Sequence, residues 1–304
     1  MIFKPIYFNE FDLILKRIGL FEDNPQIALA LSGGADSTAL LFLLNNWVLR
    51  KKGCLMTFIV DHGLRKNSFL ECLKVKEWAN QKKIKCKILR WIGKKPKSKL
   101  MEIARNERYK LIFNACEKEK IIHLMFGHHL NDRLETLYMR SKRKGNIVGL
   151  STIPQIRENN NLRIIRPFIN IRKERLIETC RFYKQSWIED PSNENEKFER
   201  VRIRNILNEK NLNYISSKIL EINKNIIKRD KYEETISYFF LKNLSYEKFG
   251  FFKLIRKELF NQNTEIQIQI IKKILTTISG EIFPPRKKSV ENLLIQIKKE
   301  KKIT

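Results

Sequence analysis

The sequence predicts an α/β protein: a parallel-sheet nucleotide-binding domain followed by a smaller helical domain. Between residues 25 and 127, short apolar runs alternate with longer segments of helical spacing, a pattern typical of a parallel sheet covered by helices on both faces. From about residue 210, helical patterns dominate and glycine-rich turns disappear. We therefore expect one domain over residues 1–210 and a helical domain over residues 211–304.

Four apolar runs bounded by turn or charged residues are expected to form buried strands: QIALALS at 26–32, CLMTFIVD at 54–61, KCKILRW at 85–91 and IIHLMFG at 121–127. Helices are expected between them over 36–50, 68–83 and 99–119. Crossovers in such a fold are right-handed, and ligands bind at the carboxyl ends of the strands. SGGADS, DHGLR and GHHLND each begin at such an end, so we expect the three motifs to converge on one edge of the sheet.

The composition indicates a polyanionic partner. The net charge is +28, from 61 basic against 33 acidic residues, and this excess repels itself unless something neutralises it. Nucleic acid is the first expectation and an anionic membrane surface the second; compositional drift toward lysine is the alternative. The last stretch, 289–304, has the pattern of an amphipathic basic helix. Such a helix more often packs its apolar stripe on a core and exposes its charges to solvent than it contacts RNA or a membrane.

The cysteines give no sign of a disulfide framework or a thiolate metal site. They are Cys54, Cys72, Cys86, Cys116 and Cys180, an odd number with no CxxC pair, which fits a reducing compartment. The N-terminus has no signal-peptide pattern, and no run approaches the ~18 apolar residues of a membrane span. We expect a cytoplasmic protein without a membrane partner.

The stretch LALSGGADSTALL at 29–41 passes from a predicted strand through two glycines to a helix start. Glycines let backbone N–H groups approach a ligand, and a helix N-terminus attracts anions. The loop lacks the lysine of the GxxxxGK[ST] pattern, which serves transfer of a terminal phosphoryl group. It therefore suits a pyrophosphate that leaves after attack at an α-phosphorus. The predicted nucleotide-binding residues here are Ser32, Gly33, Gly34, Ala35, Asp36 and Ser37.

Asp36 places an acid among these phosphate donors. Mg²⁺ is commonly held by one or two carboxylates together with substrate phosphates, so a cation between Asp36 and the phosphates explains the acid. The alternative is that Asp36 only stabilises the first turn of its helix. Helix stabilisation alone does not explain the Ser-Gly-Gly that precedes it, and we expect Asp36 to be a magnesium ligand.

The motif SGGADS resembles the pyrophosphate-binding loop (PP-loop) of the N-type ATP pyrophosphatases, which activate a carbonyl oxygen by adenylation. This resemblance implies an adenine nucleotide alpha hydrolase-like fold and the cofactors ATP and Mg²⁺. Within that superfamily, residues 25–208 resemble the tRNA(Ile)-lysidine synthetases. The motifs that carry this resemblance are VDHGLRKNS at 60–68, ARNERY at 104–109, GHHLNDRLET at 127–136, RPFINIRKE at 166–174, WIEDPSN at 187–193 and RVRIRNIL at 200–207.

The resemblance implies a two-step ligation on RNA. ATP adenylates the 2-oxo group of the wobble cytidine of tRNA(Ile) with a CAU anticodon, and free L-lysine then displaces AMP through its ε-amino group to give lysidine. The expected partners are thus this tRNA and free L-lysine, with residues 1–210 as the catalytic domain and residues 211–304 as a tRNA-binding domain. The oligomeric state is left open, a dimer being one arrangement.

Three residues after the fourth strand, His128, Asp132 and Glu135, share one side of an opening helix. A lysine ammonium, with a pKa of about 10.4, must lose a proton before it attacks, and a neighbouring imidazole or carboxylate lowers that cost. The resemblance implies that Asp132 and Glu135 hold the lysine amines and that His128 lies near the reacting groups. The same spacing could hold zinc, although no cysteine or second histidine cluster supports a zinc site.

Arginines are suited to the charge that gathers on the α-phosphorus and the leaving pyrophosphate. Arg105 and Arg108 lie three apart on a predicted helix and share a face; by motif we favour Arg108 near ATP, with a surface arginine as the alternative. Arg200 and Arg204 lie four apart on a basic helix start. One of these two is expected to meet the RNA phosphate or the adenylate, and we favour Arg200.

Two further groups follow strand-like runs. Asp61 and His62 end the second strand and are expected to contact adenosine or lysine, with capping of the DHGLR turn by Asp61 as an equal alternative. A polar turn follows WIE; the resemblance implies that it lies near the lysine and RNA sites, and it comprises Asp190, Pro191, Ser192 and Asn193.

The chain departs from the family pattern at two positions. Asn131 stands where the family usually has Asp and Arg133 where it usually has Gln, and SKRKGN at 141–146 is more basic than the family's glycine-rich segment. The chain is also short for this enzyme, and its high positive charge could compensate for the missing length in tRNA binding.

One rival function is a tRNA thiolase such as a 2-thiocytidine thiolase, which commonly uses CxxC pairs. A second is an amide-forming enzyme with a small acid substrate, which would have no use for a net charge of +28. A third is an inactive RNA-binding relative, against which the intact acids weigh.

Overall fold

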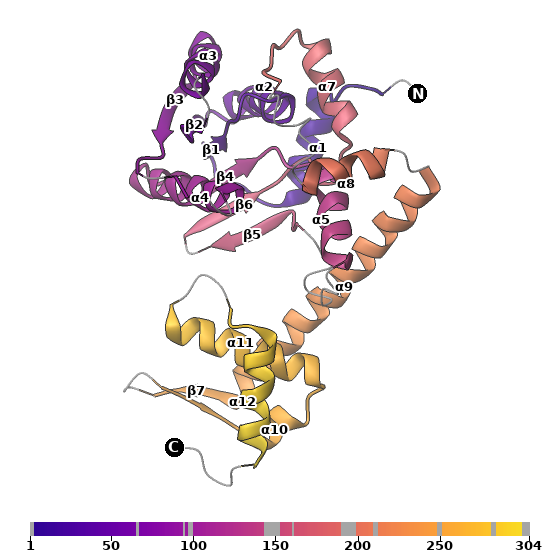
Figure 1. Ribbon diagram of the computed structural model, residues 1–304. Coiled ribbons are helices and arrows are strands. Elements are labelled where there is room, and N and C mark those ends of the chain that lie inside the picture. Colours follow the sequence, from indigo (N-terminus) through magenta and orange to yellow (C-terminus); the bar gives the residue numbers. More distant parts are fainter. Residues whose placement is uncertain are drawn as a thin grey trace. The chain divides into compact units, whose positions relative to one another are not determined.

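The computed structural model describes residues 3–64, 67–93, 95–96, 100–142, 153–159, 161–189, 199–208, 212–247, 251–280 and 284–299. These residues form two compact units that divide between residues 219 and 220. The first unit is α/β and the second is mainly helical, which confirms the predicted fold class (Figure 1). The assignment of catalysis to residues 1–210 and tRNA binding to residues 211–304 stays a prediction.

The first unit is built on a six-stranded sheet in the order β3-β2-β1-β4-β6-β5. Its strands are β1 (Gln26–Ala30), β2 (Cys54–Asp61), β3 (Lys85–Arg90), β4 (His123–Phe126), β5 (Ile156–Asn159) and β6 (Leu162–Ile165). The four predicted strands are confirmed, and they pair in parallel. Two strands were not predicted: β6, which is parallel to β4, and the antiparallel edge strand β5. Both strands are short and one is largely polar, so the alternation of apolar and polar residues is too brief to reveal them in the sequence.

Helices cover both faces of this sheet, as predicted. One core contains residues of α1 (Phe8–Ile18), α2 (Ala35–Arg50), α3 (Ser68–Gln81) and α7 (Lys173–Phe182), and the core on the other face contains residues of α4 (Leu100–Lys118). Within β1, Ile27 and Leu29 belong to the first core and Ala28 to the second, because successive strand residues point to opposite faces. The five cysteines are free.

Two helices beside the sheet carry charged residues of the predicted site: α5 (Leu130–Lys142) and α8 (Glu199–Asn208). The polar, charged run at 193–202 is expected from its composition to form a loop, but α8 begins at Glu199; residues 193–198 lie outside the described part of the chain. The strand-like WIE at 187–189 forms no strand, and Ile188 instead donates its backbone N–H to the carbonyl oxygen of Gly33 at 2.8 Å.

The strand order creates a topological switch point. Strand β1 lies between β2 and β4, so the chain leaves β1 toward one side and later returns on the other, and ligands of α/β sheets bind at such a switch point. The segment after β4 lies close to the start of α2, since a Cβ on Gly127 would be 3.1 Å from backbone atoms of Asp36 and Ser37. Because β1, β2 and β4 are parallel neighbours, the three predicted motifs do share one edge.

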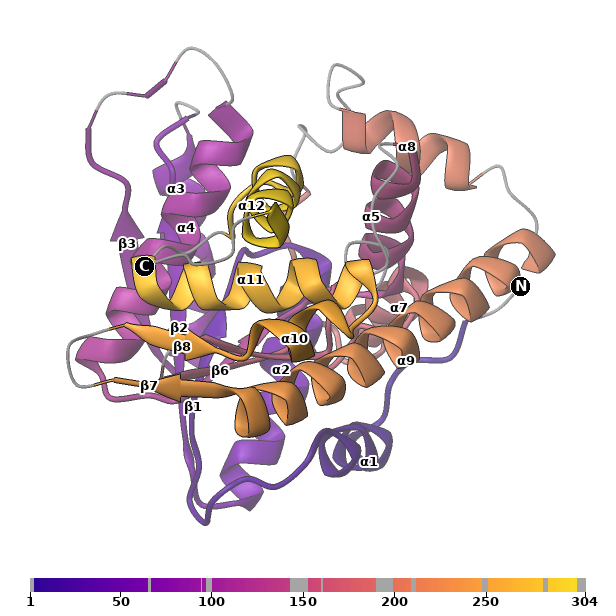
Figure 2. The ribbon, with the colours of Figure 1, turned by 90° about the horizontal axis from the view of Figure 1, so that it is seen from below.

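The second unit contains the later part of α9 (Leu212–Asn243), the strands β7 (Leu244–Tyr246) and β8 (Phe252–Leu254), and the helices α10 (Arg256–Phe260), α11 (Thr264–Ser279) and α12 (Lys287–Lys299) (Figure 2). The β7–β8 hairpin was not predicted. Val290 and Leu294 of α12 are buried in the core of this unit, as expected for a basic helix with a core stripe. Among the residues described, no helix is long and apolar enough to cross a membrane.

Candidate active site

The loop over residues 32–37, which leads from β1 into the first turn of α2, is held by its own hydroxyl and backbone groups. The Ser32 and Ser37 hydroxyls lie 3.0 Å apart, and the Ser32 backbone N–H donates to the Ser37 Oγ at 3.2 Å. The Ser37 hydroxyl in turn donates to the Gly34 carbonyl at 3.1 Å. These bonds fix the turn at the N-terminus of α2, where a helix attracts anions.

Gly33 is the residue that the loop geometry requires. Its φ of +83° lies in the left-handed region, and a Cβ there would be 2.4 Å from the Cγ2 of Val75 in α3. Its carbonyl accepts hydrogen bonds from the Ile188 backbone and the Thr38 hydroxyl. Gly34, in contrast, has an extended backbone and would place a Cβ no closer than 3.7 Å to a neighbouring atom, the Oγ of Ser32.

A histidine joins this loop to α5. The His129 Nε2 lies 3.4 Å from the Oδ2 of Asp36 and 3.6 Å from the Oδ2 of Asp132, and the His129 backbone N–H donates to Asp132 at 3.0 Å. Burial opposes protonation of this imidazole, but the two carboxylates outweigh it and raise the pKa of His129. The residue predicted from sequence was His128 and not His129. Two adjacent histidines after β4 point in different directions, and the sequence does not say which of them points toward Asp36.

The carboxylate of Glu135 is buried and paired with two arginines of α8. It is 1% exposed, with the Arg204 Nε at 2.8 Å and the Arg200 Nε at 3.1 Å, while Arg200 also lies 3.8 Å from Asp132. Burial lowers the pKa of Arg204, but the Glu135 carboxylate more than offsets this and raises it. We call His129, Asp132, Glu135, Arg200 and Arg204 the α5–α8 cluster.

A second, basic group surrounds Tyr109. Burial raises the pKa of this phenol, but Arg105, Arg108 and Arg166 lower it below its ordinary value. The Arg166 side chain is buried and donates to the Pro154 carbonyl at 2.9 Å. Arg166 was not among the predicted site residues, although its motif RPFINIRKE was recognised, since a lone arginine near the end of an unpredicted strand carries no signal. We call Arg105, Arg108 and Arg166 the arginine cluster.

His128 interacts both with Asp132 and with the arginine cluster. Burial, together with Arg166 and Arg108, lowers its pKa to about 3, although Asp132 acts in the opposite direction. The imidazole is therefore neutral near pH 7 and can accept a hydrogen bond. With so low a pKa, it is a weak base.

The two residues at the end of β2 differ in what they contact. Asp61 is buried and accepts hydrogen bonds from the Gly63 backbone N–H at 2.9 Å and the Ser68 hydroxyl at 2.7 Å, with the Arg90 Nε at 3.3 Å. Burial raises the pKa of Asp61, but these partners lower it below its ordinary value. These contacts are the ones expected if Asp61 caps the DHGLR turn. A contact of Asp61 or His62 with nucleotide stays a prediction.

Asn131 and Arg133, the predicted departures from the family pattern, contact the start of α7 and the segment before it. The Asn131 Oδ1 accepts the backbone N–H of Lys173, the first residue of α7, at 3.3 Å, and the Arg133 guanidinium donates to Asn170. Asn131 thus joins α5 to the first residue of α7, and Arg133 joins α5 to the segment before α7. The predicted turn residues Asp190, Pro191, Ser192 and Asn193 lie outside the described residues.

Comparison with known proteins agrees with this geometry. A family model described as "PP-loop domain" matches residues 8–211. A tRNA(Ile)-lysidine synthase of Orientia tsutsugamushi is 30% identical over 92% of this chain and 66% of its own length, and one of Rickettsia bellii is 34% identical over 88% and 63%. The chain thus spans slightly less than two thirds of these curated relatives.

Among solved structures, the U34-tRNA thiolase NcsA from Methanococcus maripaludis, with its [4Fe-4S] cluster, has a TM-score of 0.61 and 18% identity. The alignment covers 71% of this chain and 76% of that one. At this identity the likeness concerns the fold alone, and it agrees with the parallel sheet described above. The family match, which runs from α1 to beyond α8 and includes the glycine loop at the switch point, means that the chain belongs to the PP-loop domain family, whose members bind ATP.

Proposed function

We propose that the protein makes lysidine in tRNA(Ile) with a CAU anticodon. In the first step the O2 atom of the wobble cytidine attacks the α-phosphorus of ATP, and the bond to the bridging oxygen breaks to release pyrophosphate. In the second step the ε-amine of free lysine attacks C2 of the cytidine. The C2–O bond then breaks, AMP leaves with that oxygen, and the amine gives up a proton.

One observation carries the proposal: a single side chain, His129, connects the pyrophosphate loop with a carboxylate suited to an amine. Its Nε2 lies 3.4 Å from Asp36 and 3.6 Å from Asp132. The first step needs a phosphate site and the second needs an anionic site for the lysine ammonium. The spacing supports placing both reactions over the same cytidine. The names and the extent of the relatives support the same reaction.

On the ATP side, Ser32, Gly33, Gly34, Ala35 and Ser37 would hold the pyrophosphate through backbone and hydroxyl groups. The Oδ1 of Asp36 is buried without a hydrogen-bond partner among the described residues, which fits a cation. Mg²⁺ held there would neutralise charge on the phosphates. Arg108, which is half-buried and whose guanidinium Nε has no hydrogen-bond partner in the same part of the chain, would contact the α-phosphate.

On the amine side, Asp132 and Glu135 would bind the lysine. Burial opposes ionisation of Asp132, but His129, His128 and Arg200 lower its pKa, so it carries the charge needed to hold an ammonium. Glu135 already pairs with Arg200 and Arg204. In our proposal Arg200 turns toward the adenylate phosphate when lysine enters, and the amine takes its place. Neutral His128 accepts a hydrogen bond beside the reacting groups.

The proposal is tested by nucleoside analysis of tRNA(Ile) incubated with the protein, ATP, Mg²⁺ and lysine. Lysidine should form only with all components present, and AMP release should depend on lysine. Asp36→Asn should abolish pyrophosphate release while RNA binding remains. RNA affinity should also fall with salt, with a log–log slope of roughly −0.7 to −0.9 per phosphate neutralised.

Several outcomes would count against this function. AMP release that ignores lysine would favour a thiolase-like reaction, and tight RNA binding without any turnover would favour an inactive relative. Full turnover by Asp36→Asn would remove the case for the metal.

A further inference from the structure

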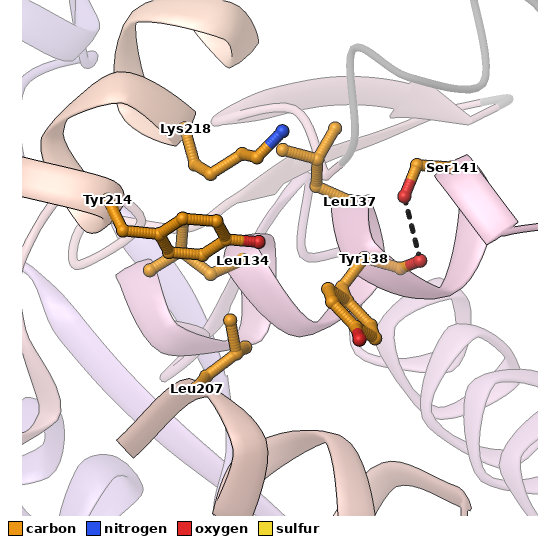
Figure 3. Close-up of a pocket in the computed structure, with 7 residues that line it drawn as sticks. All are labelled: Leu134, Leu137, Tyr138, Ser141, Leu207, Tyr214 and Lys218. Carbon is orange, nitrogen blue, oxygen red and sulfur yellow. Dashed lines mark hydrogen bonds between the residues drawn. The ribbon is translucent and has the colours of Figure 1, made fainter. Parts of the chain in front are cut away.

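A cavity of about 80 Å³ lies on the face of α5 next to the one that carries the α5–α8 cluster. Figure 3 shows the side chains that line it: four from α5, one from α8 and two from the first turns of α9. They are Leu134, Leu137, Tyr138, Ser141, Leu207, Tyr214 and Lys218. The four α5 residues follow the spacing i, i+3, i+4, i+7, which places them on one stripe of the helix.

The cavity adjoins the reaction site through the helices themselves. On α5, Leu134 is the neighbour of Glu135, and on α8, Leu207 follows Arg204 by three residues, about one turn. The pairing of Glu135 with Arg204 at 2.8 Å therefore fixes the two walls of the cavity as well as the cluster. A polymer whose reacting unit occupies the cluster would bring its neighbouring unit to this cavity.

The lining chemistry matches a flat aromatic group that carries negative charge nearby. The leucines provide an apolar floor, and each of the two tyrosines has a lysine beside its ring. The Nζ of Lys142 is 4.9 Å from the Tyr138 ring centroid, and the Nζ of Lys218 is 5.8 Å from that of Tyr214. None of the seven lining residues is acidic. Aromatic faces for stacking combined with cations for phosphate are the combination that binds unpaired nucleotides.

We propose that this cavity holds one unpaired base of the RNA substrate, adjacent to the cytidine that enters the α5–α8 cluster. The base stacks on Tyr214 and Tyr138, and Lys218 contacts the phosphate that joins the two nucleotides. This inference rests on the proposed function in that RNA is the substrate. It adds a second contact by which the enzyme would recognise the loop and hold the reacting nucleotide in place.

The test uses an anticodon stem-loop RNA with the fluorescent base 2-aminopurine beside the wobble cytidine. Stacking on tyrosine should quench the fluorescence when the wild-type protein binds. Tyr214→Leu should reduce the quench, leaving only the part due to Tyr138, and should weaken binding about ten-fold, since stacking on an aromatic side chain is worth roughly that much. Tyr214→Phe, which keeps the ring, should behave as wild type. Lys218→Ala should lower the salt dependence by about one phosphate, whereas Lys16→Ala, at an exposed position of α1, should leave it unchanged.

Unchanged affinity and unchanged quenching in Tyr214→Leu would overturn the inference. If that variant folds poorly, Ser141→Leu serves instead: Ser141 is exposed, so the leucine side chain would fill the cavity mouth without disturbing the core and without offering an aromatic face. An unchanged quench in Ser141→Leu would equally overturn the inference. RNA binding and quenching without any lysidine formation would refute the proposed function alone. A wild-type protein that does not bind the RNA would refute both.

Discussion

The pyrophosphate loop and the α5–α8 cluster hold their functional groups in different ways. The loop is built from six consecutive residues, and its hydroxyl bonds join positions no more than five apart. The cluster is built from charged side chains on two helices, and its bond from Arg204 to Glu135 joins positions 69 apart. The loop therefore depends on backbone shape, and the cluster depends on charge pairing across packed helices. Substitutions should damage the two regions by different mechanisms.

The largest effect is expected for Gly33→Ala in the loop. A left-handed φ costs a non-glycine residue about 1–2 kcal/mol, and the overlap with Val75 adds about 1–3 kcal/mol. We expect the free energy of unfolding to fall by about 2–5 kcal/mol and pyrophosphate release to be lost. Chemical denaturation and a pyrophosphate assay measure the two effects.

Gly34→Ala is the matched control for this substitution. Its backbone is extended, and its Cβ would meet nothing closer than 3.7 Å, so stability should be nearly unchanged. Equal destabilisation by the two variants would contradict the view that backbone shape at one residue defines the loop.

A smaller effect is expected for Glu135→Gln in the cluster. Removing the charge takes the Glu135 carboxylate from Arg204 and leaves Arg200 with Asp132 alone; loss of one partner costs about 3–5 kcal/mol in a fully buried pair. Because these arginines are 34% and 26% exposed, we expect about 2 kcal/mol of destabilisation. Under the proposed function, adenylated RNA should accumulate because lysine no longer binds.

Glu117→Gln, on an exposed position of α4, controls for the loss of one negative charge and should change neither property. If Glu135→Gln instead blocks adenylation, the division of labour between the loop and the cluster is wrong.

The different construction of the two regions also explains what could be predicted from sequence. Local patterns predict the loop, four of the strands and the common edge of the three motifs. These patterns are glycines after an apolar run and short apolar runs between helical segments. The pairing of Glu135 with Arg204 is not local, since it depends on how α8 packs against α5. The same holds for His129, whose direction differs from that of its neighbour, and for Arg166, which follows an unpredicted strand.

Substitutions at Asn131, a predicted departure from the family pattern, test whether this side chain stabilises the structure around the cluster. Its Oδ1 accepts the N–H of Lys173 at the start of α7, so Asn131→Ala should cost about 1 kcal/mol, as loss of a helix cap does. Asn131→Asp keeps an acceptor there and adds a charge that favours a helix N-terminus. It should restore or exceed wild-type stability. Thermal denaturation of both variants measures the change in stability. Equal losses of stability in the two variants would mean that the contact between Asn131 and Lys173 does not stabilise the protein.

The smallest effect, visible only in acid, concerns a histidine that lacks the carboxylate partners of the cluster. Burial above all, with Arg108 and Lys95, lowers the pKa of His62 from 6.5 to about 4. Between those values the unfolded chain binds more protons than the folded one, so folded stability should decline as the pH falls from 6.5 toward 4 and should not depend on His62 above 6.5. His62→Gln should reduce this slope without abolishing it, because His128 contributes in the same direction. Denaturant titrations at several pH values measure the slope. An identical slope in the variant would mean that His62 titrates normally, and that its burial does not distinguish it from the paired groups of the cluster.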